Sequence, residues 1–252
     1  MSLTKRVFTV LASIFIIIGV TGCMSEKEEL VKYLEEKYGG KYEVVRYWTE
    51  NTATSKLAHQ MLVHPKGEPN ILFKTGKYWS PTKQKEVFWD NYIQSKWSID
   101  YTEEHKNKII SLDSRKMDVK FSIGVSGDPG SKFLNKTMGD YLKDKTGKEA
   151  LPSGRIIVAI ECDQEPDRKQ EAELLFQMYK KIKNWGFDSY ELNVIYVKTK
   201  YFKEAKELLG FMQADYMVPF EAFKRDSYYY FVYLLDDITT PEDILDEFRT
   251  GE

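Results

Sequence analysis

The sequence has few of the residues that most often build metal and nucleophile sites. It contains two cysteines and three histidines in 252 residues, with neither an HExxH pair nor a cluster of cysteines. Zinc sites need several such ligands at close spacing, so we predict no metal and no cofactor. Two cysteines also exclude a disulfide-rich scaffold, and the fold must therefore rest on its hydrophobic core or on a metal.

An excess of positive charge is also missing. The chain carries 37 Lys and Arg residues against 39 Asp and Glu residues, for a net charge of −2. Because nucleic acid binding depends on clustered positive charge, this balance predicts no nucleic acid partner.

Recognisable catalytic motifs are absent as well. The segment GVSGD at residues 124–128 has its second glycine one position too early for a nucleophile elbow, and Pro129 blocks the helix that should follow. The pairs at residues 76–77 and 147–148 lack the upstream glycine of a phosphate loop. Asp163, Glu165 and Asp167 are the best-placed acidic residues for a hydrolase, although the entrance of a helix also explains them. We predict no catalytic residue.

What the sequence does contain begins at its N-terminus. Lys5 and Arg6 precede an apolar run at residues 7–20. As a helix this run would be about 21 Å long, which is short of the ~30 Å hydrocarbon core of a bilayer. The pattern is typical of a signal peptide rather than a membrane span.

The last residue of this run and the three that follow it resemble the lipobox of bacterial lipoproteins. They are Val20, Thr21, Gly22 and Cys23. The resemblance implies cleavage before Cys23, which removes residues 1–22, and transfer of a diacylglyceryl group to the Cys23 thiol. Two acyl chains hold a protein stably on a membrane. We therefore expect a lipid-anchored protein on the extracytoplasmic side of the cell membrane, with Cys162 as its one remaining thiol.

The rest of the chain predicts an α+β or α/β fold with helices packed on a mixed β-sheet. A capping-box pattern at Ser25 and Glu28 predicts a helix over residues 26–38. Strands are predicted at 42–48, 57–63, 70–74, 117–125, 155–162, 192–198 and 228–235, and helices at 86–97, 103–111, 135–145, 172–182, 201–209 and 241–248. Gly and Pro residues at 146–154 predict a boundary between an N-terminal half (23–150) and a C-terminal βαβαβα half (151–252). Similar aromatic-glycine pairs at residues 38–39 and 185–186 raise the alternative that the halves are related.

Aromatic residues offer the main indication of a binding surface. Four of the five tryptophans lie between residues 48 and 97. Large aromatic side chains dominate binding hot spots, while core packing is the alternative explanation for them. We expect Tyr78, Trp79, Trp48 and Tyr229 to form a partner surface.

Two segments, YLEEKYG at residues 33–39 and WDNY at residues 89–92, resemble uncharacterised small surface lipoproteins of Gram-positive bacteria. Some proteins of that kind are immunity partners of secreted toxins. The resemblance implies a membrane-anchored binding protein with a protein partner, and an immunity protein is one form of it. A cell-envelope hydrolase that uses carboxylates and a ligand-binding lipoprotein of a transporter remain the alternatives.

Overall fold

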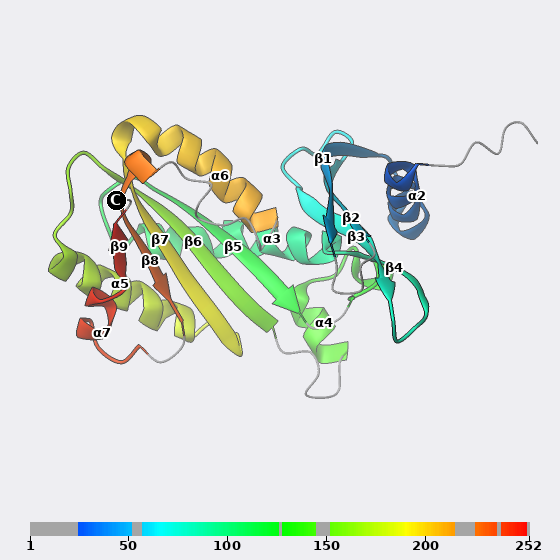
Figure 1. Ribbon diagram of the computed structural model, residues 1–252. Coiled ribbons are helices and arrows are strands. Elements are labelled where there is room, and N and C mark those ends of the chain that lie inside the picture. Colours follow the sequence, from blue (N-terminus) through cyan, green and yellow to red (C-terminus); the bar gives the residue numbers. More distant parts are fainter. Residues whose placement is uncertain are drawn as a thin grey trace, which may run out of the picture.

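The computed structural model describes residues 25–51, 57–125, 128–144, 152–214, 225–235 and 238–250. Within these ranges the chain forms two β-sheets with helices packed on them, which confirms the predicted α+β class (Figure 1). The first sheet is antiparallel and consists of β1 (Tyr42–Asn51), β2 (Leu57–Pro65), β3 (Phe73–Ser80) and β4 (Lys85–Asp90), in that order. The second is mixed and consists of β5 (Met117–Val125), β6 (Pro152–Cys162), β7 (Ser189–Lys198), β8 (Tyr228–Leu234) and β9 (Phe248–Thr250), in that order.

The helices lie on the faces of the sheets and between them. They are α2 (Glu26–Tyr38), α3 (Tyr92–Ile110), α4 (Met138–Asp144), α5 (Arg168–Lys183), α6 (Phe202–Ala214) and the single turn α7 (Glu242–Leu245). Short 3-10 turns occur at Ser131–Phe133, Thr199–Tyr201 and Arg225–Ser227. None of the helices in the described part of the chain is both long enough and apolar enough to span a bilayer.

Helix α2 covers one face of the first sheet. The Ser25 hydroxyl accepts a hydrogen bond from the Glu28 backbone N–H, and the Glu28 carboxylate accepts one from the Ser25 N–H, so the predicted capping box is present. Leu30 and Leu34 are the buried residues of α2. They pack against Met61, Val63 and Phe73 of the sheet.

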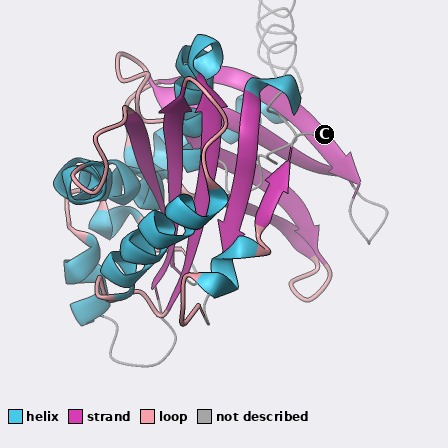
Figure 2. Ribbon diagram, turned by 90° about the vertical axis from the view of Figure 1, so that its left-hand side faces the viewer, coloured by secondary structure: helices cyan, strands magenta, loops and turns pink. Residues whose placement is uncertain are grey.

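The second sheet is covered on both faces. Helices α3 and α5 contribute to the larger core, on the face of β6 that carries Ile156, Val158 and Ile160, whereas α6 packs on the opposite face over Ile157 and Ala159. Figure 2 shows helices in front of and behind the strands. This two-sided burial explains why β6 is an almost uninterrupted apolar run.

Several predicted elements were wrong in part. The strand predicted at 70–74 starts only at Phe73 and runs to Ser80, and the helices predicted at 86–97 and 103–111 are, from Tyr92 on, parts of one helix, α3. Residues 86–90 form β4 rather than the start of a helix, because Val87, Phe88 and Trp89 pair with β3, and the helix starts only after Asn91. Gly210 lies inside α6 instead of following it. In the predicted last helix only 242–245 is helical, and Phe248 begins β9, which pairs with β8.

The transition between the sheets differs from the boundary predicted at residues 146–154. That boundary separates β5 from β6, yet these strands are hydrogen-bonded neighbours in one sheet. The chain passes from the first sheet to the second along α3, between Asp90 and Met117. The first sheet is an antiparallel meander and the second contains a parallel pair, so their topologies give no support to related halves.

Candidate functional site

The edges of the two sheets differ in how well their backbone groups are protected. Along β5, the Thr102 and Ser98 hydroxyls of α3 accept hydrogen bonds from the Phe121 and Ile123 N–H groups at 3.0 and 2.8 Å. The Gln213 side chain of α6 donates to the Phe121 carbonyl at 2.9 Å. Helical side chains therefore satisfy the outer edge of this strand, which is a recognised way of preventing unwanted strand pairing.

Strand β1 has no such cover among the described residues. It pairs only with β2, it is ten residues long, and none of its residues is buried. The other outer strands, β4 and β9, have six and three residues. An exposed edge strand presents a row of N–H and C=O groups to which another strand can add. Strand β1 is therefore the longest free edge in the described structure.

The free edge is divided by a β-bulge and carries aromatic side chains. The register with β2 shifts between Val44 and Arg46, so the uninterrupted part is Arg46–Asn51, which we call the edge segment. Tyr47 is 37% exposed, and its hydroxyl lies 2.6 Å from His59 Nδ1. The Arg46 guanidinium lies over the Trp48 ring, 5.6 Å from the centroid of the ring. The segment thus carries one cationic side chain, two aromatic side chains and one acidic side chain, in that order.

One end of the first sheet is tied to the start of α2. The Lys77 ammonium contacts the carboxylates of Glu26, Glu29 and Glu86, and its side chain is only 3% exposed. Burial lowers the pKa of this ammonium, but the hydrogen bonds to the three carboxylates outweigh burial and raise it overall. Lys77 is therefore charged and fixes the first turn of α2 over β3.

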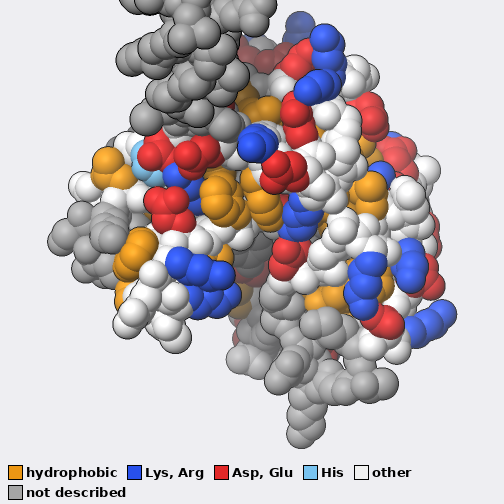
Figure 3. Space-filling view, turned by 90° about the vertical axis from the view of Figure 1, so that its right-hand side faces the viewer, with side chains coloured by type: hydrophobic (Ala, Val, Ile, Leu, Met, Phe, Trp, Pro, Cys, Tyr) orange, Lys and Arg blue, Asp and Glu red, His pale blue; other side chains and the backbone are white. Residues whose placement is uncertain are grey.

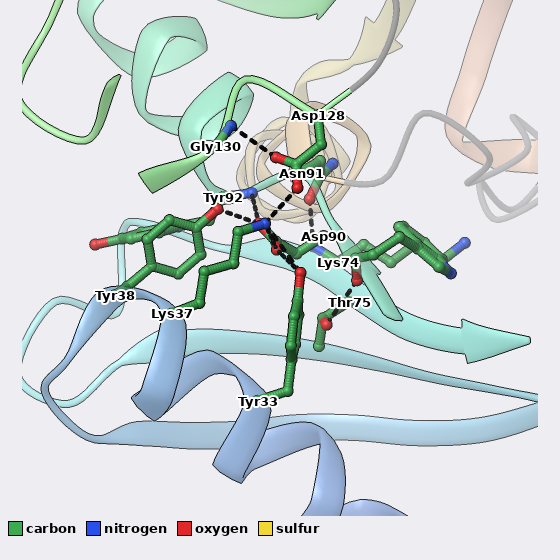
Figure 4. A network of polar contacts seen from close by, with 11 residues as sticks. Tyr33, Lys37, Tyr38, Lys74, Thr75, Asp90, Asn91, Tyr92, Asp128 and Gly130 are labelled. Atoms are coloured by element: carbon green, nitrogen blue, oxygen red, sulfur yellow. Dashed lines mark hydrogen bonds and ion pairs between the residues drawn. The ribbon is translucent and has the colours of Figure 1, made fainter. Parts of the chain in front are cut away.

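A second polar network joins the opposite end of α2 to both sheets (Figure 4). Asp90, whose side chain is 1% exposed, accepts hydrogen bonds from the Tyr33 and Tyr38 hydroxyls and the Lys37 ammonium, each at 2.8 Å. Lys37 also lies 2.6 Å from the Asp128 carboxylate, which follows β5. In the figure these side chains converge on the Lys37 ammonium, and Asp128 approaches from the opposite side. The network holds the two sheets in a fixed relation.

A pocket of about 660 Å³ opens at the carboxyl end of β6. It includes the acidic residues singled out in the sequence, Asp163, Glu165 and Asp167. Asp167 caps α5, since its side chain accepts hydrogen bonds from the first-turn N–H groups. Glu165 accepts a hydrogen bond from the Tyr230 hydroxyl. The helix-entrance explanation therefore describes this cluster well.

The floor of the pocket contains an arginine that the sequence did not reveal. The Arg115 guanidinium makes two hydrogen bonds of 2.8 Å to Glu171 and is also bound to Asp113, so its donors are already occupied. Hydrogen bonding to Arg115 lowers the pKa of Asp113, which is the opposite of what a general acid requires. Burial raises the pKa of the neighbouring Cys162 to about 11, so this thiol is protonated at neutral pH.

Metal binding gains no support from the described residues, because no group of three or more His, Cys, Asp or Glu side chains among them is placed to hold an ion. His59 lies beside Tyr47, and His64 lies 3.7 Å from Glu43. His105 stacks on Trp185.

The four aromatic residues expected to share a partner surface are dispersed. Tyr78, which is 40% exposed, and the partly exposed Trp79 are neighbours on β3 and point to opposite faces of the sheet. Trp48 lies on the Tyr78 face. Tyr229 belongs to the second sheet, where its hydroxyl donates to the Asp163 carbonyl at 3.3 Å. The predicted lipobox, Val20 to Cys23, lies outside the described residues.

These features define an α+β protein with one long free sheet edge. No protein-family model matches the chain, and no curated protein matches it. Among solved structures, a DUF5037 family protein from Ruminococcus gnavus ATCC 29149 is similar, with 17% sequence identity and a TM-score of 0.48. The match covers 86% of this chain and 95% of that one.

Proposed function

We propose that this protein is a bacterial surface lipoprotein, anchored through Cys23 on the extracytoplasmic side of the cell membrane, that binds another protein along β1. The observation that carries the binding proposal is the contrast between edges: side chains of α3 and α6 protect β5, whereas no residue of β1 is buried and no described side chain caps its edge segment. Long free edges are a liability for a soluble domain unless they have a use.

The chemistry of the edge segment describes the partner that it fits. An added strand gains affinity from main-chain hydrogen bonds and specificity from the side chains beside it. Tyr47 and Trp48 offer aromatic contact on the two faces of the sheet, and Arg46 and Glu50 offer one charge of each sign. The partner is therefore a protein with an exposed strand that carries an apolar residue between charged ones. A secreted toxin, as the resemblance to immunity lipoproteins implies, is one protein of this kind.

Two alternatives have less support from the geometry. A carboxylate hydrolase needs a carboxyl group that stays protonated, and the pocket at β6 instead lowers the pKa of Asp113. A transporter lipoprotein needs lobes that open, and the buried Lys37–Asp90 pair with Asp128 ties the two sheets together.

The anchor is tested by replacing one thiol at a time. We expect Cys23→Ser to move the protein from the membrane fraction to the medium or periplasm and to remove the acyl mass from its N-terminal peptide. Cys162→Ala is the matched control. Because this thiol is buried, the substitution leaves the membrane location and the acyl mass of the N-terminal peptide unchanged. A Cys23→Ser protein that stays bound to the membrane contradicts the anchor.

The binding edge is tested with prolines at adjacent positions. In an edge strand, successive N–H groups point alternately to the neighbouring strand and to solvent, and proline removes one N–H. Of Tyr47→Pro and Trp48→Pro, one therefore disrupts the pairing with β2, and the other keeps the parent's urea midpoint. Benzoylphenylalanine in place of Glu50 serves to photo-crosslink the partner on intact cells. We expect the proline variant that keeps the parent's urea midpoint to lose this crosslink. Unchanged crosslinking in that variant contradicts binding along β1.

A further inference from the structure

The end of the first sheet that lies next to the start of α2 has the composition of a membrane-contacting surface. Five of its residues, which we call the sheet tip, are Leu57, Tyr78, Trp79, Lys83 and Lys85. Leu57 is 51% exposed and Tyr78 is 40% exposed. Both lysines are exposed in or beside the turn between β3 and β4. Tyr and Trp combine an apolar ring with a polar group, and this suits them to the headgroup region of a bilayer.

Sheet register brings these residues together. His59 of β2 lies opposite Lys77 of β3, so Leu57 and Trp79, each two residues further toward the strand end, share one face of the sheet. Ser80 pairs with Lys85 at the same end of the sheet. Leu57 and Trp79 thus lie on the α2 face of this end of the sheet, and Tyr78 and Lys85 lie on the opposite face.

The start of α2 is fixed at this same end. Lys77, two residues before Trp79, contacts Glu26 and Glu29 in the first turn of the helix. Ser25 is locked by its capping box. Cys23 precedes Ser25 by two residues, which span about 7 Å when fully extended. A lipid on Cys23 therefore leaves the sheet tip within reach of the membrane that holds it.

We infer that the sheet tip rests on the bilayer surface and orients the protein, with the edge of β1 running from the tip, where Asn51 pairs with Leu57, toward the opposite end of the sheet. This inference depends on the proposed anchor at Cys23. The exposed apolar and aromatic side chains drive the contact, because no charge of one sign dominates there: three lysines, Lys77, Lys83 and Lys85, share this end of the sheet with the three carboxylates that bind Lys77, those of Glu26, Glu29 and Glu86. Figure 3 looks onto this side of the molecule and shows hydrophobic, basic and acidic side chains intermixed. The contact therefore does not require anionic lipid and does not weaken in salt.

The test uses the mature lipidated protein in vesicles of phosphatidylcholine, with and without phosphatidylglycerol. A polarity-sensitive dye is attached to Tyr78→Cys or Leu57→Cys, with Glu173→Cys on α5 as the control position. Cys162 stays unlabelled because it is buried and its pKa is raised. We expect dye at position 57 or 78 to shift to shorter wavelength and to be quenched several-fold more by brominated phosphatidylcholine than dye at position 173. Both lipid compositions give the same result, also at high salt.

The outcomes separate the inference from the proposed function. Water-like emission at positions 57 and 78, in a protein that Cys23→Ser releases from the membrane, overturns the inference and leaves the anchor standing. Membrane binding that survives Cys23→Ser overturns the anchor instead. A shift at position 78 that needs added partner protein rather than vesicles assigns the sheet tip to that partner and also overturns the inference.

Discussion

Removing the Asp90 carboxylate is expected to destabilise the protein more than removing any exposed ion pair. Four groups donate to this carboxylate: the Tyr33 and Tyr38 hydroxyls, the Lys37 ammonium and the Tyr92 backbone N–H. In Asp90→Asn the amide cannot accept all four hydrogen bonds, and Lys37, whose side chain is 15% exposed, loses its closest buried counter-charge. Breaking a buried pair in this way costs about 3–5 kcal/mol.

The measurement is urea unfolding followed by circular dichroism. Lys32 and Glu36 form the matched control, because they lie on the same helix and their side chains are 58% and 68% exposed. An exposed pair of this kind contributes about 0.3–0.5 kcal/mol, so Lys32→Met should hardly move the midpoint. A double-mutant cycle between Asp90→Asn and Lys37→Met should give a coupling energy of about 0.5–3 kcal/mol. A loss below about 1 kcal/mol in Asp90→Asn, with no coupling to Lys37, would refute this account of the network.

The same network makes stability depend on pH with a definite sign. Burial, followed by the charge of Asp90, raises the pKa of Tyr33 and of Tyr38. Burial lowers the pKa of Lys37, but the hydrogen bonds that its ammonium donates to Asp128, Asp90 and Tyr33 outweigh burial and raise the pKa overall. The native state therefore binds more protons than the unfolded chain at high pH. The stabilisation is complete below the unfolded pKa values of about 10 and declines as pH rises beyond them. The urea midpoint should fall between pH 9 and pH 11, and by less in Asp90→Asn; an equal fall in both proteins would contradict this assignment.

Three further experiments test the packing. In Gly76→Ala the new Cβ would come within 2.9 Å of the Trp89 indole, so we expect the free energy of unfolding in urea to fall by about 1–3 kcal/mol. Gly210→Ala is the control, because Gly210 has open space around it, and this variant should be as stable as the parent or more stable. Equal effects of the two substitutions would refute the close approach at Gly76. Thr102→Val leaves a β5 backbone N–H without its acceptor and should cost about 1–3 kcal/mol, and an unchanged midpoint would mean that the edge needs no cap. With a thiol pKa of about 11, Cys162 should react far more slowly with Ellman's reagent at pH 8 in the native protein than in urea, and equal rates would contradict its burial.

Much of the local structure could be predicted because its causes are local. The capping box at Ser25 and Glu28 marked the start of α2, and the apolar run of β6 marked a strand covered on both faces. The error at residues 86–90 has a tertiary cause. Trp89 and Trp97 fit a helical spacing, but pairing with β3 and packing of Trp89 over Gly76 make this segment a strand.

The candidate site was harder to predict because it depends on which strands lie at the edges. Nothing in the sequence of β1 or β5 says that α3 will cap one of them and leave the other free. The sequence located the acidic residues of the pocket at β6, but it missed Arg115, because its partner Glu171 lies 56 residues away. Tyr78 and Trp79 were recognised as surface residues, although their adjacent positions on one strand separate them onto opposite faces.

By itself the sequence determined the chemistry of each segment: a helix that begins at Ser25, strands that alternate or are wholly apolar, and a chain without clustered cysteine or histidine. These properties depend on neighbours within a few residues. Only the tertiary structure decided that β1 is a free edge, that Lys77 fixes the start of α2 beside Leu57 and Trp79, and that Asp90 is buried under Lys37. The physical reason is that strand order and helix docking are set by contacts between residues far apart in the chain, whose combined burial energy no local pattern records.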